Sequence, residues 1–113
     1  MRAGPVIACV VGLIATACAP PVSSGGFDAP DPSSRIYAIE RAIHANDLSK
    51  TPLIVEQLDS DDPAVRFMAI AALKKLTGET YGYHYEDPPS LREPAIQRWV
   101  AHVNESFPDD PDG

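Results

Sequence analysis

Two segments of this chain, which begin 31 residues apart at Asp31 and Asp62, repeat one pattern of residues. Both start with Asp-Pro and continue with an arginine and then an Ala-Ile pair. The five identical pairs are Asp31 with Asp62, Pro32 with Pro63, Arg35 with Arg66, Ala38 with Ala69, and Ile39 with Ile70. A period of this length is typical of stacked supersecondary units, none of which buries its apolar face alone. We therefore expect a small helical stack, an architecture that is used mostly for binding.

The spacing of apolar residues predicts four helices. They cover about residues 32–46, 51–59, 63–77 and 90–107. Asp31 and Asp62 are predicted N-caps, and each precedes a proline at the first helical position, where a missing N–H costs no hydrogen bond. Asn46 is the predicted end of the first helix, and Gly78 that of the third. Ser90 and Glu93 have the spacing of a capping box, which predicts the start of the last helix.

The helix over 63–77 carries apolar residues around most of its circumference, which predicts burial on two sides. Its alanines, Ala69 among them, allow neighbouring backbones to approach closely. The last helix has the cleanest single apolar stripe, and Trp99 lies within it. A tryptophan in such a stripe is expected in the core.

Residues 1–17 have the pattern of an export signal: a positive start at Arg2, then an apolar stretch too short to span a bilayer comfortably. The last step, Ala15-Thr16-Ala17-Cys18, resembles the lipobox of bacterial lipoproteins. This resemblance implies that Cys18 is acylated and becomes the mature N-terminus. Simple secretion and an uncleaved anchor are the alternatives. Cys9 is the only other cysteine, and if this region is processed neither cysteine can form a disulfide within the fold.

Residues 18–30 are rich in proline, serine and glycine, and such a segment cannot bury enough apolar surface to become ordered. They are predicted to be a disordered, lipidated tether, in which Phe27 is expected to contact the domain. The helical domain is predicted over 31–107, and an acidic disordered tail over 108–113.

Near Asp62 the motif Asp-Pro-x-Val-Arg-x-x-Ala-x-x-Ala-Leu resembles the second helix of HEAT repeats, in the short form of phycobilisome-lyase-type proteins. The residues that carry this resemblance are Asp62, Pro63, Val65, Arg66, Ala69 and Leu73. Residues 51–60 resemble the first helix of that repeat, 31–43 resemble an earlier copy, and the last helix resembles a terminal cap. The resemblance implies an all-α fold, a short α-α solenoid fragment of about two repeats plus a capping helix. It also implies that Arg66 pairs with Asp31 or Asp59.

The loop over 81–87 gathers aromatic and polar side chains. Tyr81, Tyr83, His84 and Tyr85 are its candidate binding residues. Such residues can hold a sugar or a peptide, and His84 with Glu86 and Asp87 offers donors to a metal. The favoured interpretation is that the tyrosines pack the loop against the helices with their hydroxyls in water. No metal site is predicted, because zinc ligands commonly come as His or Cys pairs at defined spacing.

Other chemistry is not indicated. The net charge is −7 and the nine Lys and Arg residues are scattered, which argues against a nucleic-acid groove and against charge-driven adhesion to anionic lipid. Nucleophile elbows, phosphate-binding glycine loops and His-Glu-x-x-His are absent from the sequence. The acidic run Asp59, Asp61 and Asp62 lacks the spacing of a calcium loop and is predicted to be a cap and a solvated turn. No catalytic residue and no cofactor is predicted.

Together these features predict an exported, lipid-anchored protein of the bacterial envelope. Its expected role is that of a protein-interaction or scaffold module for another envelope protein. One alternative is a binder of a small ligand or glycan that uses the loop over 81–87. Another is an accessory factor to a bilin-type lyase, which only the family resemblance indicates and which the export signal argues against.

Overall fold

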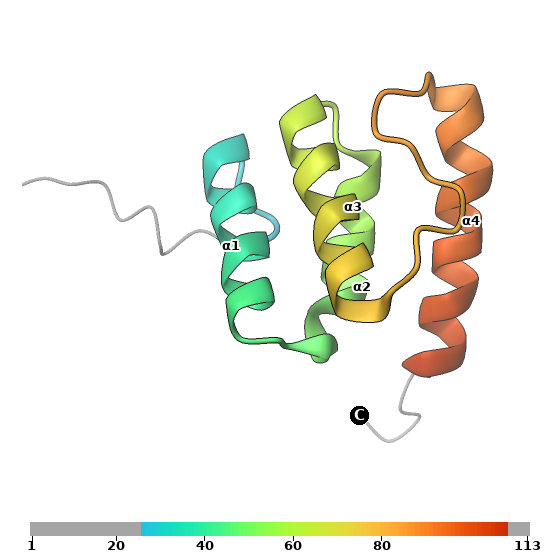
Figure 1. Ribbon diagram of the computed structural model, residues 1–113. Coiled ribbons are helices and arrows are strands. Elements are labelled where there is room, and N and C mark those ends of the chain that lie inside the picture. Colours follow the sequence, from blue (N-terminus) through green and yellow to red (C-terminus); the bar gives the residue numbers. More distant parts are fainter. Residues whose placement is uncertain (1–25, 109–113) are drawn as a thin grey trace, which may run out of the picture.

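The computed structural model describes residues 26–108, and these residues form an all-helical structure without strands. Its elements are α1 (Pro32–His44), the 3₁₀ turn η2 (Leu48–Lys50), α2 (Thr51–Glu56), the 3₁₀ turn η3 (Gln57–Asp59), α3 (Pro63–Thr77) and α4 (Pro89–Ser106) (Figure 1). The all-α prediction is confirmed. The predicted signal, Cys18, most of the tether and most of the tail lie outside the described residues.

The predicted starts of α1 and α3 are confirmed. The Asp31 carboxylate accepts a hydrogen bond of 2.9 Å from the backbone N–H of Ser34. Asp62 accepts from the N–H groups of Ala64 and Val65, at 2.8 and 3.2 Å. These bonds satisfy N–H groups that have no partner within a helix. The equivalent residues of the two repeat copies therefore have the same role.

The helix ends follow from residues that tolerate a left-handed backbone. Gly78 ends α3 with φ of 84°, and its N–H donates to the carbonyl of Lys74 at 2.8 Å. α1 ends at His44, two residues before the predicted end, and Asn46 has a φ of 50°. Glycine and, to a lesser degree, asparagine adopt this conformation at low cost.

The predicted capping box of α4 is wrong. The N-cap is Pro88, which makes no side-chain hydrogen bond, and the helix begins at Pro89. Ser90 therefore lies inside the first turn, where its hydroxyl cannot cap the helix. The reason is local: Pro89 has the φ of a first helical residue, and an extended backbone is favoured for Pro88 because it precedes a proline.

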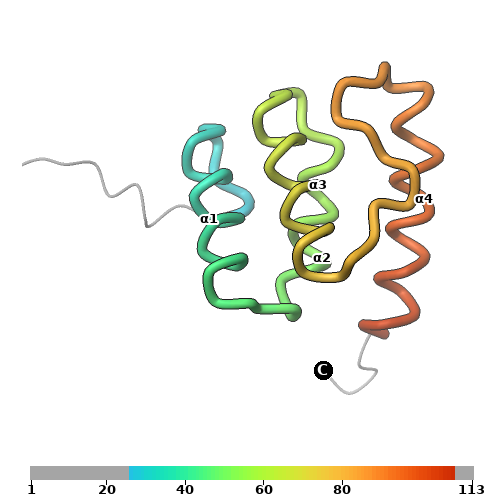
Figure 2. The backbone as a smooth tube through the Cα atoms, viewed as in Figure 1, coloured from blue at the N-terminus to red at the C-terminus, as the bar shows by residue number. Residues whose placement is uncertain are grey.

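The helices are packed so that α2 and α3 each contact two other helices. α1 packs on α3, α2 packs on α3, and α2 also packs on α4. Figure 2 shows α1, α3 and α4 in a row with α2 behind α3, while the connection between α3 and α4 returns along α3 before α4 begins. This connection covers the side of α3 that faces α4, and so shapes the surface there.

The core lies between these helices, and most of its buried residues are apolar. Its largest fully buried side chains are Trp99, Ile39, Ile54, Leu58, Leu73 and Val65. The expectation that Trp99 lies in the core is confirmed. Phe27 is partly buried against this core, and its carbonyl accepts a 2.8 Å hydrogen bond from the Gln57 side chain. Thus residues from the predicted tether contact the helices.

No helix among residues 26–108 is long and apolar enough to cross a bilayer.

Candidate functional site

The loop between α3 and α4 is held by side chains that donate hydrogen bonds to its backbone. The Trp99 indole donates to the Thr80 carbonyl and the Arg98 Nε donates to the Tyr81 carbonyl, both at 2.9 Å. The Arg92 Nε donates to the Asp87 carbonyl, also at 2.9 Å. All three donors belong to α4, so the loop is fixed along that helix. Its exposed side chains therefore have a defined position.

Tyr83 anchors the middle of this loop. It is 3% exposed, and its hydroxyl donates a 2.6 Å hydrogen bond to the carbonyl of Leu58. Burial raises the pKa of the Tyr83 hydroxyl above its usual 10.0, because the phenolate would lose its hydration. Tyr83 thus packs the loop as expected, but its hydroxyl is buried and bonded to protein where a solvated one was predicted.

Tyr81 lies on the other side of the loop, against α4. Its ring meets that of Trp99 edge-on at 4.8 Å between centroids, and its hydroxyl lies 3.2 Å from the Nδ1 of His102. The backbone φ of Tyr81 is 53°, an uncommon value for a tyrosine. Tyr81 is therefore separated from the other predicted binding residues.

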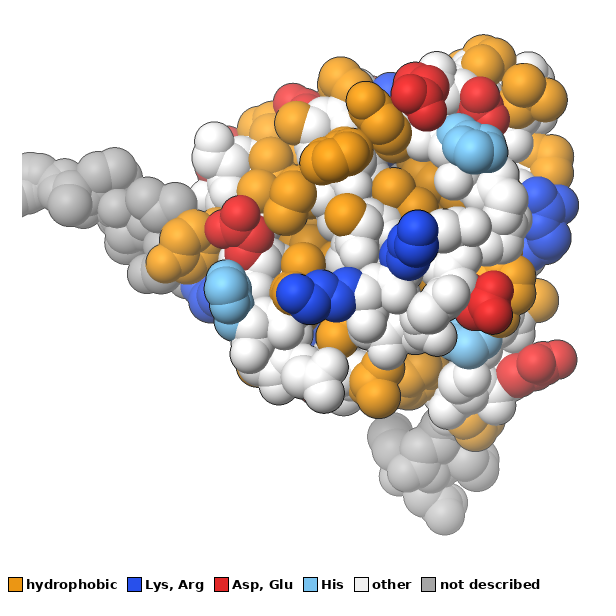
Figure 3. Space-filling view, in the orientation of Figure 1, with side chains coloured by type: hydrophobic (Ala, Val, Ile, Leu, Met, Phe, Trp, Pro, Cys, Tyr) orange, Lys and Arg blue, Asp and Glu red, His pale blue; other side chains and the backbone are white. Residues whose placement is uncertain are grey.

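The remaining three predicted residues lie together in a groove between α3 and the loop, with a volume of about 410 Å³. The lining residues are Phe67, Ile70, Ala71 and Lys74 from α3, and Thr80, Tyr83, His84, Tyr85 and Glu86 from the loop. We call this the α3 groove. Phe67 is 49% exposed and meets the Tyr85 ring edge-on at 5.1 Å. Figure 3 shows hydrophobic side chains gathered over α1 and α3 on this side of the molecule.

The α3 wall of the groove is the part that sequence reasoning missed. Apolar residues cover most of this helix and burial was expected on two of its sides, yet Phe67 and Ala71 are exposed. The spacing of Phe67, Ile70, Ala71 and Lys74 places all four on one helix face. That face could have been recognised in the sequence as a second apolar stripe, but not as the one left in contact with water.

Arg66 holds the loop beside the α3 groove, but its partners differ from the carboxylates that were expected. Its Nη1 donates to the Ser60 carbonyl at 2.8 Å and its Nε to the Tyr85 carbonyl at 3.0 Å. The predicted ion pair with Asp31 or Asp59 is wrong. The long loop brings the Tyr85 carbonyl to the guanidinium, and backbone carbonyls there satisfy it. The apolar motif residues Val65, Ala69 and Leu73 are wholly buried.

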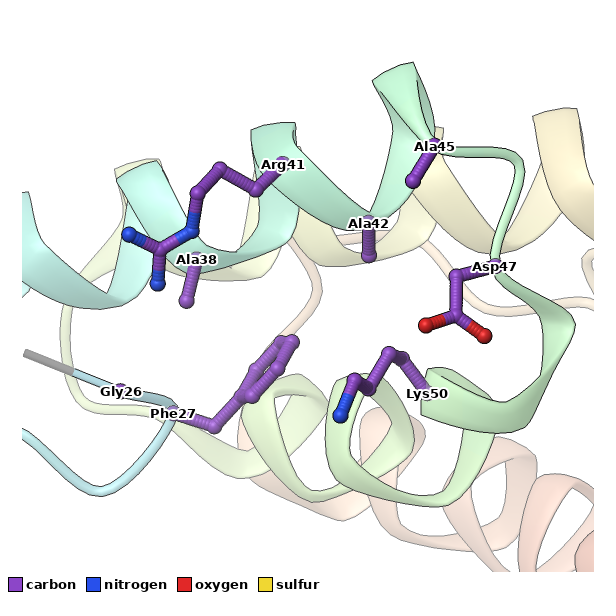
Figure 4. Close-up of a pocket in the computed structure, with 8 residues that line it drawn as sticks. All are labelled: Gly26, Phe27, Ala38, Arg41, Ala42, Ala45, Asp47 and Lys50. Carbon is purple, nitrogen blue, oxygen red and sulfur yellow. The ribbon is translucent and has the colours of Figure 1, made fainter. Parts of the chain in front are cut away.

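A second groove lies between α1, η2 and residues 26–27, and its volume is about 350 Å³. We call this the α1 groove. Its lining residues are Gly26, Phe27, Ala38, Arg41, Ala42, Ala45, Asp47 and Lys50. Figure 4 shows the three alanines pointing from α1 into the space, with the Phe27 ring entering from the other side. This groove was not predicted from the sequence.

Among the described residues no group of three or more His, Cys, Asp or Glu side chains could hold a metal ion. His84, Glu86 and Asp87 are therefore not gathered into such a group. In the comparisons with known proteins, no family model, no curated protein and no solved structure matches the chain. The function is therefore inferred from the geometry of the two grooves and from the sequence pattern.

Proposed function

We propose that this chain is an exported, lipid-anchored HEAT-like protein that binds another protein of the bacterial envelope through the α3 groove. The proposal joins two parts: the export and acylation pattern that ends at Cys18, and the groove on the helical body. In this role the protein acts as a scaffold and carries out no reaction.

The order of packing supports the HEAT-like part of the proposal. In a helical repeat, the first helices of successive repeats stack on one another, and so do the second helices. Here α1 and α3 carry the repeated Asp-Pro motif and pack together, while α2 packs on α4. This is the arrangement expected if α2 and α3 form one complete hairpin, α1 is the second helix of an earlier copy and α4 is the cap.

The observation that carries the binding role is the exposure of Phe67 beside Tyr85. An aromatic side chain that is 49% exposed on a helix, in edge-on contact with a second aromatic ring, leaves apolar surface in water. Ile70 and Ala71 extend this surface along α3 for another turn. Exposed apolar surface with polar residues at its rim is typical of protein-binding sites, and Lys74 and Glu86 provide that rim.

A small ligand or glycan is the second candidate occupant, because His84 and Tyr85 lie in the same groove. Aromatic rings can stack on the apolar face of a sugar. Tyr83 contributes little to such a site, since its ring is buried and its hydroxyl is already bonded to Leu58. The protein partner is favoured because the apolar surface extends along α3, beyond the loop residues that would hold a sugar.

Site-specific photo-crosslinking in intact bacteria tests the proposal. A photoreactive amino acid at position 67 should give a discrete protein adduct, and Tyr85→Ala should remove it. The same probe at position 91 is the matched control, because Leu91 is 59% exposed but lies at the start of α4. An adduct equally strong at both positions, or one unaffected by Tyr85→Ala, would refute the α3 groove as the binding surface. Capture of a glycan with no protein adduct would favour the second candidate.

A further inference from the structure

The α1 groove has apolar walls and carries charged residues of both signs. Ala38, Ala42 and Ala45 follow one another at helical spacing on α1, so that a single helix face forms one wall. Ala38 and Ala42 are buried, whereas Ala45 is exposed at the rim. Phe27 forms the opposite side, as Figure 4 shows. The apolar side of the groove therefore suits a short apolar group.

Two cationic side chains and one anionic side chain also line the groove. Arg41 comes from α1, and its guanidinium also lies 5.3 Å from the centre of the Tyr37 ring. Lys50 comes from η2, and in Figure 4 its side chain extends toward the Phe27 ring with the Asp47 carboxylate above it. A ligand in this groove can therefore meet both positive and negative groups within the same small volume.

The Asp47 carboxylate is charged at neutral pH. It accepts hydrogen bonds from the hydroxyl and the backbone N–H of Ser49, at 2.5 and 3.1 Å. These bonds, with a smaller effect from the Lys50 cation, lower the pKa of Asp47 below its usual 3.8. A purely anionic ligand would therefore be repelled by Asp47, while a ligand that also carries a cation would gain from it.

The groove also lies close in sequence to the proposed lipid anchor. Gly26 lines it, and Gly26 is eight residues after Cys18. A fully extended chain of eight residues spans at most about 28 Å. If Cys18 carries acyl chains, the groove is held within that distance of the lipid surface. Tethering of this kind gives lipid head groups a high effective concentration at the groove.

We propose that the α1 groove binds the head group of a zwitterionic aminoalkyl phospholipid. Its phosphate lies between Arg41 and Lys50, its ammonium faces Asp47, and its glycerol end rests on the alanines and Phe27. This inference rests on the proposed lipid anchor. A zwitterionic head group also agrees with the net charge of −7, which repels the chain as a whole from an anionic surface.

The test uses isotope-labelled full-length chain with Cys18→Ser, so that no acyl chain is attached. It is titrated with dihexanoyl phosphatidylethanolamine below its micelle concentration, and amide NMR shifts are followed. Saturable shifts at Ala38, Ala45 and Lys50 are expected. Dihexanoyl phosphatidylglycerol should bind about tenfold more weakly because its head group lacks the ammonium. Inorganic phosphate should not saturate these shifts at the same concentrations.

Three variants separate this site from general surface effects. Lys50→Gln should weaken phosphatidylethanolamine binding about tenfold, whereas the control Lys75→Gln, exposed at the end of α3, should leave it unchanged. Asp47→Asn should reduce the preference for phosphatidylethanolamine over phosphatidylglycerol to about one. A merely structural role for Asp47 would weaken binding of both lipids alike. Thermal unfolding of each variant checks that its fold is retained.

Equal binding of both lipids to the unsubstituted groove, an equal loss in Lys75→Gln, or no saturable shift would overturn the inference. The proposed anchor is judged by separate acyl labelling of Cys18 in cells. Labelled Cys18 together with a groove that binds no lipid would refute this inference alone. Unlabelled Cys18 together with saturable, ammonium-dependent binding would support the site and refute the anchor.

Discussion

The Tyr83 hydroxyl donates a 2.6 Å hydrogen bond to the backbone carbonyl of Leu58, across 25 residues of chain. Leu58 lies in η3, between α2 and α3, and Tyr83 lies in the loop between α3 and α4. Both residues are almost fully buried. This one contact therefore ties η3, the turn before α3, to the loop that forms the other wall of the α3 groove.

Tyr83→Phe should lower the free energy of unfolding by about 1–2 kcal/mol, because it leaves the buried Leu58 carbonyl without its donor. Tyr37→Phe is the matched control, since Tyr37 is 43% exposed on α1, and it should change stability by less than about 0.5 kcal/mol. Urea unfolding followed by circular dichroism measures both. Equal stability of the two variants would show that the hydrogen bond contributes nothing.

The raised pKa of Tyr83 predicts a loss of stability in alkali. Burial keeps this hydroxyl protonated in the folded chain at pH values where the unfolded chain ionises it, above about its usual 10.0. The unfolded state then binds fewer protons, so the free energy of unfolding falls as pH rises above that value. Urea midpoints between about pH 8 and about pH 11 should fall less in Tyr83→Phe than in the unsubstituted protein. Parallel curves would contradict this.

Ala69→Asp should unfold the domain or destabilise it by several kcal/mol, because Ala69 is wholly buried on α3 and a carboxylate there has no partner. Ala71→Asp, two residues along the same helix, places the same group in water and should keep a cooperative unfolding transition. Thermal unfolding of the pair measures the effect of position alone. A normal melting curve for Ala69→Asp would mean that α3 is placed wrongly.

Asp62→Ala should destabilise the fold by about 1 kcal/mol, because the N–H groups of Ala64 and Val65 lose their capping oxygen. Asp61→Ala removes an equal charge from the exposed neighbouring residue and should have little effect. The difference between their urea midpoints measures how much the Asp62 cap contributes to stability. If both variants lose the same amount, charge rather than capping is responsible.

Cys18→Ser should abolish metabolic labelling of the protein with a fatty-acid analogue in bacteria, because the lipobox interpretation makes this sulfur the acceptor of the diacylglycerol group. Cys9→Ser is the matched control and should retain the label. Labelling that persists in Cys18→Ser would refute the anchor.

The parts of the fold that were predicted well depend on neighbouring residues. Asp31, Asp62 and Gly78 act on backbone groups within four residues of themselves, so their roles follow from spacing alone. Trp99 was placed correctly in the core because its helix has only one apolar stripe. Such signals do not depend on which other elements lie nearby.

The predictions that failed involve competition between two partners. Ser90 and Glu93 had the spacing of a cap, but Pro88 and Pro89 start α4 before the box. Arg66 was expected to pair with a carboxylate, but the loop places the Tyr85 carbonyl within hydrogen-bond distance of its guanidinium. Sequence spacing gives the available partners and does not show which of them comes within bonding distance.

The sequence by itself determined the all-helical fold, the residues that begin α1 and α3, the glycine that ends α3, and the apolar positions able to form a core. The tertiary structure alone decided which face of α3 stays in water, which tyrosine of the loop is buried, and that Phe27 closes a groove beside α1. The physical reason is the distance along the chain over which each interaction acts. Helix caps and helical periodicity act within one or two turns, whereas exposure depends on which distant segment covers a residue, and α3 has more apolar faces than its neighbours cover.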